Sequence, residues 1–485
     1  MSLAAATTDF SLLRPEAALA AGLCAILAAD LLPGSRTRNI TPWLGLLACA
    51  LAFTFSLAAP TGNVGSMLAI DGLTNLARCL ILACTAAVLL AGAGERRART
   101  DQGAWSVSVL AIGLGALLTA AAANFVPLWL GLELIGLASY TLVAFRGGHR
   151  LAAEAGMKFV LFGGAASGLM LFGISHIFGI TGHLDFVGIG AAVATGMPVP
   201  VVVALAFASI GIAYKLTLVP FHFYSPDVYQ GAPALSVAVV STVPKIAAVA
   251  ALVRGLQLAV PTSFVATSAV ATALATASAI SVLTAAFLAV AQRDAKRILA
   301  FSGIGHGAIV LLAIACLPGD DATAAAGYYL LTYAPANLGA WLCLSILERD
   351  HASCELTALA GAGSRRPVVT ALLCVFLFSL AGVPPLAGFL GKWGVLQQAF
   401  AHGLAADGTT ALVVAALITV LATAVAAWSY LLIVRAVLLA DAPPTNGKPL
   451  LAVARPSVVV LAVCTAAVLW LGLWLAGLPA IARAL

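Results

Sequence analysis

Charge is what this sequence has least of. Only 9% of its 485 residues are charged and 62% are hydrophobic, whereas soluble proteins are roughly 25% charged and about 45–50% apolar. This composition excludes a soluble enzyme. It also excludes an intrinsically disordered chain, which would have few apolar residues. A polytopic membrane protein remains.

Motifs for metals, disulfides and nucleic acids are also missing. The nine cysteines include no C-x-x-C pair, which argues against an iron–sulfur cluster or a structural zinc site. The net charge is +6, but no long basic run with interleaved aromatic residues occurs. We therefore expect no nucleic-acid partner.

Long apolar runs fill the chain, and a spanning helix needs about 20 mostly apolar residues. The sequence predicts an all-α polytopic membrane protein with 14 transmembrane helices, at about 15–33, 42–60, 70–92, 104–121, 123–146, 154–180, 199–220, 232–254, 264–290, 297–317, 323–347, 367–400, 409–438 and 455–480. No connection is long enough for a soluble domain, so we expect residues 1–485 to form a single membrane domain.

The orientation follows from the basic residues. Connections after odd-numbered spans carry almost all Lys and Arg outside the spans, whereas the other connections and both ends carry only Arg14, Arg254 and Arg483. The positive-inside rule places the first set in the cytoplasm. We therefore expect both termini on the periplasmic side. The abundance of alanine favours a bacterial inner (plasma) membrane.

Prolines interrupt two of the predicted spans. Pro220 lies in KLTLVPFHFYSPDVYQGAP between two apolar runs, and Pro384 and Pro385 lie inside the long run at 367–400. Prolines at membrane depth predict broken helices whose freed backbone groups line polar cavities. Because the breaks fall in different halves of the chain, we predict an inverted repeat. Its parts are three N-terminal helices in 1–100, five-helix repeats at 104–254 and 264–438, and a C-terminal helix at 455–480.

Charges inside the spans are the clearest functional signal. They are Arg78, Glu133, Lys158, Lys215, Lys245 and Lys392. A charge at the centre of a membrane helix costs roughly 2.5–3.5 kcal/mol on insertion scales and usually marks a functional site. Lys215, Lys245 and Lys392 each lie near a proline, so we expect broken helices around them and interpret them as functional.

Two of these charges, Lys158 and Arg78, have structural alternatives. Lys158 follows Glu154 by four residues, so an interfacial ion pair competes with a transport role. Arg78 follows Asp71 by seven residues, and we interpret it as structural, with its guanidinium extending toward an interface. A scaffold in which all buried charges only fix helix packing is a third interpretation of the whole set.

Lysines near a glutamate suit proton transfer. Burial disfavours the charged form of a lysine and a nearby carboxylate favours it, so a change at the carboxylate switches the lysine between holding and releasing a proton. The spacing fits neither a metal site nor a nucleophile. His222 in PFHFY and His306 in SGIGH can pass protons near pH 7 and are further candidates, with a hydrogen-bonded structural role as the alternative.

Several stretches carry a resemblance to a known family. In chain order, across about 130–400, they are GLELIGLASYTLVAF, AEAGMKFVLFGGAASGLMLFG, YKLTLVPFHFYSPDVYQGAP, AQRDAKRILAFSGIGHGAIVLL and SLAGVPPLAGFLGKW. They resemble the antiporter-like, proton-translocating subunits of NADH-quinone oxidoreductase (respiratory complex I). The block PFHFYSPDVYQGAP is most similar to the N branch of that family. Lys392 argues against the M branch, which is expected to carry glutamate there.

The resemblance implies roles for the charged residues. Glu133 matches the glutamate of the family's fifth helix, and Lys215 the seventh-helix lysine that pairs with it. Lys245 matches the central lysine of the eighth helix, and Lys392 the lysine of the broken twelfth helix. Lys158 resembles a sixth-helix lysine. The implied activity is proton pumping through a Glu/Lys relay, coupled to electron transfer from NADH to quinone.

The resemblance also implies partners and shows departures. It implies no cofactor in this chain, with FMN, iron–sulfur clusters and quinone in partner subunits, and with other membrane subunits, lipids and protons as partners. Tyr224 replaces a usual tryptophan, Gln230 stands where glutamate is common, and Gly303 and Gly305 replace the usual residues of SSIAH. The alternative function is a subunit of a multi-subunit cation/proton antiporter.

Overall fold

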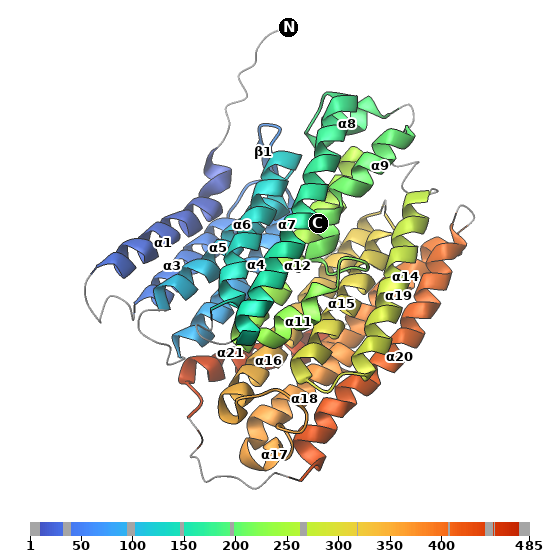
Figure 1. Ribbon diagram of the computed structural model, residues 1–485. Helices are drawn as coiled ribbons and strands as arrows, with labels where there is room; N and C mark the ends of the chain where they lie inside the picture. The colour runs from blue at the N-terminus through green and yellow to red at the C-terminus, as the bar shows by residue number, and fades with distance from the viewer. Residues whose placement is uncertain are drawn as a thin grey trace.

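The computed structural model describes residues 10–32, 40–94, 102–145, 150–194, 198–261, 269–317, 319–405, 408–441, 450 and 452–474. These residues form a bundle of long helices that lie side by side, with one small antiparallel hairpin (Figure 1). In Figure 1 the N-terminal helices α1 and α3 lie at the left of the bundle, and α14 and α20 lie at the right.

The described residues of the N-terminal part form six helical segments. They are η1 (Phe10–Leu13), α1 (Arg14–Leu31), α3 (Thr41–Leu57), α4 (Gly72–Ala93), α5 (Gln102–Ala121) and α6 (Phe125–Val143). Between α3 and α4, strand β1 (Gly62–Val64) pairs antiparallel with β2 (Leu68–Ile70). Sequence reasoning missed this hairpin because three-residue strands leave almost no periodicity to detect.

The middle part contains the first interrupted span. Its helices are α7 (Arg150–Thr181), α8 (Phe186–Ala192), α9 (Val199–Ala208), α10 (Ile210–Lys215), α11 (Tyr224–Gly231) and α12 (Ala234–Ala259). The chain leaves the helix after Lys215 and turns through residues 216–223 before α11 begins. The Val219 amide donates to Ser281 Oγ of α14 at 3.1 Å. The predicted interruption near Pro220 is confirmed, and a neighbouring helix satisfies part of its backbone.

The C-terminal part contains the second interrupted span. Its helices are α14 (Ala269–Val290), α15 (Ala295–Ile314), α16 (Asp320–His351), α17 (Ala362–Arg365), α18 (Pro367–Ala381), α19 (Ala387–Gly403), α20 (Thr410–Leu439) and α21 (Arg455–Leu473). Gly382 ends α18 in the left-handed region at φ +88°, which glycine adopts without a steric penalty. The predicted interruption at Pro384 and Pro385 is confirmed.

Short polar residues start several helices inside the bundle. The Asp71 carboxylate accepts from the Thr74 amide at 2.8 Å and caps α4. Asn124 accepts from the Val126 amide at 2.9 Å and caps α6, which explains how two spans are separated so narrowly in the sequence. Each cap satisfies an amide that the first helical turn leaves without a partner.

Three helices form the centre of the bundle. In the most apolar segment of each, 94% of the residues of α12 and 89% of those of α15 and α16 are buried, against 28% in α7 and α20. Functional groups on α12, α15 and α16 are therefore enclosed by protein. The exposed faces of α7 and α20 suit contact with lipid or partner subunits.

Membrane crossing is supported by most of the helices. Among the described residues, 11 helices are long and apolar enough to span a membrane, and three shorter apolar helices are Thr41–Leu57, Val199–Lys215 and Pro367–Ala381. The all-α polytopic membrane fold is confirmed. The count of 14 spans stays a prediction, as do the repeats at 104–254 and 264–438.

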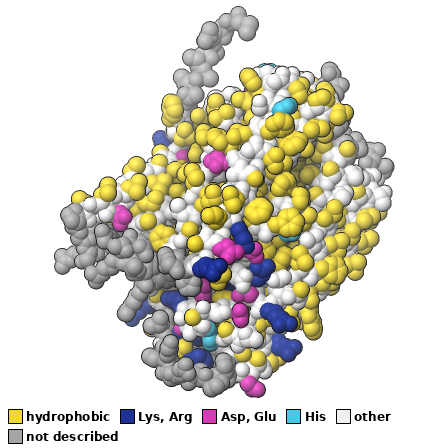
Figure 2. Space-filling model, viewed as in Figure 1, with side chains coloured by type: hydrophobic (Ala, Val, Ile, Leu, Met, Phe, Trp, Pro, Cys, Tyr) yellow, Lys and Arg dark blue, Asp and Glu magenta, His cyan; other side chains and the backbone are white. Residues whose placement is uncertain are grey.

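Basic side chains gather toward one end of the molecule. In Figure 2 the visible Lys and Arg side chains lie mainly in the lower half of the view, where α17 and α18 lie in Figure 1, and apolar side chains cover most of the upper half. The termini, residues 1–9 and 475–485, lie outside the described residues, so their predicted periplasmic location stays a prediction.

Three expectations about basic residues were wrong. Arg78 does not extend to an interface: it is fully buried and pairs with Glu16 of α1 at 2.6 Å. Arg254 and Lys296, which the sequence placed in connections, are buried within α12 and α15. In each case the compensating carboxylate, which is Glu16, Asp71 or Glu348, comes from a distant part of the sequence, so local sequence does not reveal it.

The neighbourhood of Lys245 also differs from expectation. Pro244 lies inside α12, and the helix continues through it from Ala234 to Ala259. Of the three lysines near prolines, only Lys215 and Lys392 therefore lie at interrupted helices. Neighbouring helices can satisfy the backbone groups that a proline frees, so the helix need not break.

Candidate functional site

Lys215 is the last residue of α10, at the first interruption. Its ammonium lies against α6, because a Cβ added to Gly136 would be 3.4 Å from Lys215 Nζ. Glu133 precedes Gly136 by three residues and so shares that side of the helix. The charges of Glu133 and Lys215 interact. No ion pair of 4.0 Å or less is found between Glu133 and Lys215 among the described residues. The two side chains are therefore not in direct contact.

Aromatic side chains hold the first interruption beside Lys215. The Tyr224 hydroxyl donates to the Tyr214 carbonyl at 3.0 Å, and the Tyr214 hydroxyl donates to the Phe159 carbonyl at 3.1 Å. The rings of Phe159 and Tyr224 stack with centroids 5.1 Å apart. The tyrosine that replaces the family's usual tryptophan therefore ties α11 back to α10.

Lys245 lies at the buried centre of α12 and is 3% exposed. Its ammonium donates to the Gly303 carbonyl of α15 and lies 5.9 Å from the Tyr333 ring centroid of α16. A Cβ at position 303 would be 3.1 Å from Lys245 Nζ. Glycine at this position therefore leaves room for the ammonium group.

Lys392 lies on α19, just after the second interruption. Its ammonium donates to the Leu380 carbonyl at 2.8 Å and to the Ala381 carbonyl at 2.9 Å. These are the last residues of α18, whose carbonyls have no partner within their own helix. The helix dipole also favours a positive charge at this end. The interruption therefore provides the binding site for Lys392.

His306 lies on α15 between the two lysines and is 6% exposed. Gly303, whose carbonyl accepts from Lys245, lies three residues earlier on the same helix. Its Nδ1 lies 2.5 Å from the Tyr329 hydroxyl. A cavity of about 30 Å³ is lined by His306, Lys392 and Tyr430 among others, which is enough volume for a water molecule.

Two tyrosines of α16 complete this region, and sequence reasoning missed them. Tyr329 contacts His306, and the Tyr333 hydroxyl is buried without a hydrogen-bond partner among the described atoms. The ring centroids of Tyr333 and His306 are 4.9 Å apart. Tyr329 and Tyr333 are four residues apart, which places both on one face of a helix. This spacing is the feature of the sequence that could have indicated them.

His222, the other histidine candidate, lies in the turn between α10 and α11. It is 4% exposed, and its Nδ1 has no partner within the described part of the chain. Its ring contacts Phe223. No described hydrogen bond links it to the lysines, so its role stays a prediction.

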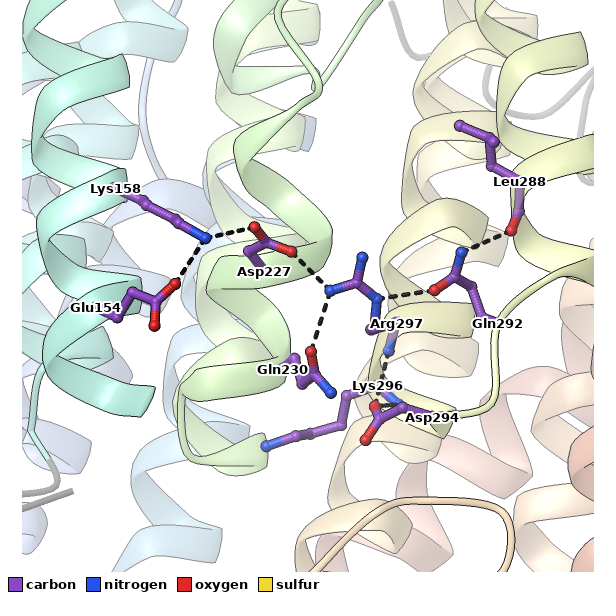
Figure 3. A network of polar contacts seen from close by, with 9 residues as sticks. All are labelled: Glu154, Lys158, Asp227, Gln230, Leu288, Gln292, Asp294, Lys296 and Arg297. Carbon is purple, nitrogen blue, oxygen red and sulfur yellow. Dashed lines mark hydrogen bonds and ion pairs between the residues drawn. The ribbon is translucent and has the colours of Figure 1, made fainter. Parts of the chain in front are cut away.

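Lys158 belongs to a separate polar cluster on α7, α11 and α15 (Figure 3). The predicted pair with Glu154 is confirmed at 2.9 Å, and a second carboxylate, Asp227, lies 2.7 Å away. Asp227 also accepts from Arg297 at 2.6 Å, and Arg297 donates to Gln230 at 3.0 Å. The structure therefore places the half-exposed Lys158 with these partners and apart from Lys215, Lys245 and Lys392.

Asp227 is the carboxylate shared by two basic groups in this cluster. Burial raises its pKa, but hydrogen bonds from Lys158 and Arg297, together with their positive charges, bring the pKa below its usual value. Asp227 is therefore ionised at neutral pH. It ties α11 to both α7 and α15.

A further buried lysine has a different environment. Lys296 of α15 pairs with Glu348 of α16 at 3.1 Å, and both are nearly inaccessible. Lys296 also donates to the Ala232 carbonyl at 2.8 Å, and Glu348 accepts from the Ala234 amide at 3.0 Å. This pair fixes the start of α12 against two neighbouring helices.

The sequence matches a family and many relatives in it. The family described as NADH:quinone oxidoreductase/Mrp antiporter, TM, matches residues 122–422. NADH-quinone oxidoreductase subunit N of Parvibaculum lavamentivorans is 34% identical over 427 residues, which cover 87% of this chain and 86% of the relative. The same subunit of an Anaeromyxobacter species is 33% identical over 486 residues, covering 95% and 93%.

The fold matches solved membrane complexes. A chain of respiratory complex I from Thermus thermophilus superposes with a TM-score of 0.78 at 29% identity, covering 96% of this chain and 99% of that one. A chain of the Mrp complex from a Dietzia species gives a TM-score of 0.79 at 19% identity, covering 99% and 97%. At that lower identity the likeness shows the fold alone.

Proposed function

The chain belongs to the NADH:quinone oxidoreductase/Mrp antiporter family of membrane proteins, and from that premise we propose that Glu133, Lys215, Lys245 and Lys392 form its proton relay. Relatives over most of its length are subunits of NADH-quinone oxidoreductase. The chain is accordingly a proton-translocating membrane subunit of such an enzyme complex. The relay is the part of this function that the arrangement of buried charges supports.

The proposed order follows the buried groups through the bundle. Glu133 and Lys215 interact at the first interruption, Lys245 occupies the central helix, and Lys392 occupies the second interruption. His306 lines the same cavity as Lys392, and its ring lies 4.9 Å from that of Tyr333, whose centroid is 5.9 Å from Lys245 Nζ. We propose that it passes a proton between the two lysines, with Tyr329 orienting its ring. Water in the adjacent cavity would complete the connection to Lys392.

One observation carries the proposal: the described partners of Lys245 and Lys392 are backbone carbonyls, not carboxylates. A lysine that loses its proton beside a carboxylate leaves a buried anion without compensation, which is costly. A lysine that loses its proton beside a carbonyl leaves no buried anion. In the proposed relay, Lys245 and Lys392 can therefore alternate between the protonated and the neutral form. Lys296, by contrast, pairs with a carboxylate, Glu348, at 3.1 Å, and we assign it to packing.

Glu133 is the proposed control group. Because its carboxylate interacts with Lys215 without contacting it, a small movement or a change of its charge would alter the preference of Lys215 for a proton. Moving one charge against 100 mV costs about 2.3 kcal/mol. Partner subunits must supply that energy as a change in charge or conformation near Glu133.

We further propose that electron transfer takes place in partner subunits, which would hold FMN, iron–sulfur clusters and quinone. No group of three or more His, Cys, Asp or Glu side chains comes together as a metal site in the described ranges. Other membrane subunits, lipids and protons are the proposed partners. The proposed location is a bacterial inner membrane, with both termini on the periplasmic side.

A cation/proton antiporter subunit is the alternative that the sequence left open. The sequence of this chain is 34% and 29% identical to complex I subunits, but only 19% identical to the matching chain of the Mrp complex. The comparison with the Mrp complex therefore shows a shared fold alone. Flavin and non-haem iron that co-purify with the tagged chain in fixed proportion would support the redox complex. Their absence from an otherwise intact membrane particle would favour the antiporter.

Substitution of Lys245 tests the relay. Lys245→Met removes the titratable group, and Lys245→Arg keeps the positive charge but cannot release a proton at cellular pH. In the assembled complex we expect both variants to lose most proton pumping. Protons moved per electron, together with the rate of quinone reduction, measure this. Restoration by arginine would support the scaffold interpretation, and unchanged pumping in both variants would remove Lys245 from the relay.

A further inference from the structure

A groove outside the relay opens between α18 and α21 and has a volume of about 730 Å³. Large apolar side chains line it and remain accessible. Val368 on α18 is 69% exposed, and Val458 and Leu469 on α21 are 51% and 46% exposed. Both helices belong to the apolar, membrane-embedded part of the chain, so the groove faces the hydrocarbon region.

The length of the groove matches one leaflet of a bilayer. Its lining on α21 runs from Val458 to Leu469, which is roughly 16 Å at 1.5 Å per residue. The hydrocarbon core of a bilayer is about 30 Å thick. On α18 the lining ends at Leu372, before the middle of that helix. On α21 it stops at Leu469, four residues before that helix ends. The groove therefore begins at one surface and closes before the other.

Two arginines lie at the surface end of the groove. Arg366 forms an ion pair with Asp350 at 2.8 Å, which compensates its charge. Arg365 is partly exposed, and no described carboxylate lies within 4.0 Å of it. The mouth thus keeps a net positive charge. It lies on the side that the distribution of arginines in the sequence assigns to the cytoplasm.

We propose that this groove binds one anionic phospholipid of the cytoplasmic leaflet, with its phosphate at Arg365 and an acyl chain along α21. Basic pockets between membrane helices on the cytoplasmic side recognise anionic headgroups, and guanidinium groups bind phosphate through charge-assisted hydrogen bonds. A membrane-spanning helix of a partner would need a groove across the whole bilayer. This one ends after a single leaflet, which favours a lipid.

Photocrosslinking in the native complex tests the proposal without reference to proton pumping. The complex is placed in nanodiscs that contain phosphatidylglycerol or phosphatidylcholine with a photoreactive acyl chain. Crosslinked peptides of α21 are then measured. We expect phosphatidylglycerol to label the segment around Ala462 several-fold more than phosphatidylcholine does.

Two pairs of variants make the result specific. Arg365→Gln should reduce labelling by phosphatidylglycerol to the level of phosphatidylcholine. Arg293 is an exposed arginine on the same side, and Arg293→Gln should leave the labelling unchanged. Ala462→Trp should fill the groove and abolish labelling. Val463 is exposed and lies outside the lining, so Val463→Trp should leave the labelling unchanged. Equal labelling by both lipids, equal effects within either pair, or a crosslink from Ala466→Cys to another protein subunit would overturn the proposal.

Discussion

Each of the three central lysines lies against a glycine. Gly136 faces the ammonium of Lys215, Gly303 faces that of Lys245, and a Cβ on Gly382 would be 3.0 Å from Lys392 Cδ. A glycine exposes bare backbone and leaves space beside it. For Lys245 and Lys392, the described partners of the ammonium are backbone carbonyls, which is the arrangement that the proposed relay rests on.

The first prediction concerns the glycine beside Lys245. Gly303→Ala adds a Cβ 3.1 Å from Lys245 Nζ, whereas Gly305→Ala adds one whose nearest neighbour is Ala285 Cβ at 3.7 Å, an ordinary contact. We expect Gly303→Ala to displace the ammonium from the Gly303 carbonyl and slow proton pumping several-fold. Gly305→Ala should pump like the wild type. Proton uptake by vesicles with the assembled complex measures both, and equal rates would contradict the role assigned to Gly303.

Interruptions of helices place the charged groups where unbroken helices could not. At the first, Lys215 ends α10 and tyrosine hydroxyls tie α11 back to it. At the second, the end of α18 presents two carbonyls to Lys392. In both, backbone groups that a continuous helix would use internally are available to side chains.

The second prediction separates backbone strain from the position of Lys392. Gly382 and Gly182 both have a left-handed backbone, at φ +88° and +72°, but only Gly382 has Lys392 beside it. Alanine at either position should cost roughly 1–2 kcal/mol of stability. Only Gly382→Ala should also impair proton pumping. Thermal stability and pumping of the two variants test this, and equal pumping by both would show that Gly382 acts through strain alone.

The third prediction concerns the cluster that joins α7, α11 and α15. Because hydrogen bonds from Lys158 and Arg297 lower the pKa of Asp227, its stabilisation is present above the ordinary aspartate pKa of about 3.9. The stabilisation is lost only as the pH falls through the lowered value. Asp227→Asn should therefore reduce stability by the same amount throughout pH 5–8.

The expected loss for Asp227→Asn is below about 1 kcal/mol for each exposed ion pair. Thermal release of the subunit from the complex, measured across this pH range, gives the comparison. Asp441→Asn, at an exposed site, serves as the control. A loss that grows or disappears between pH 5 and pH 8 would show that another group titrates in the cluster.

At the scale of the whole molecule, apolar runs and proline positions predicted the helices well. The two interruptions and the membrane fold followed from them. Partners between distant helices could not be predicted in the same way. Nothing near Arg78 in the sequence indicates Glu16, and nothing near Lys296 indicates Glu348. Tyr329 reaches His306 only because α15 and α16 pack together, so sequence spacing alone could not reveal this contact.

The fourth prediction concerns the orientation of the bundle. Ser66 lies in the exposed turn of the hairpin, and Thr357 lies in the exposed connection between α16 and α17. The arginine distribution places Thr357 in the cytoplasm and Ser66 outside. A membrane-impermeant maleimide should label Ser66→Cys in intact spheroplasts and Thr357→Cys only in inverted vesicles. The reverse pattern would invert the proposed topology.

The buried pair of Glu16 and Arg78 has a consequence for how the chain is made. A ribosome delivers Glu16 to the membrane before Arg78 has been synthesised, and the two are 62 residues apart. Until Arg78 arrives on α4, Glu16 in the first turn of α1 has no basic partner from that helix. The native contact between α1 and α4 can therefore be completed only after the third of these helices has been synthesised, so the order of synthesis delays the packing of the first helix.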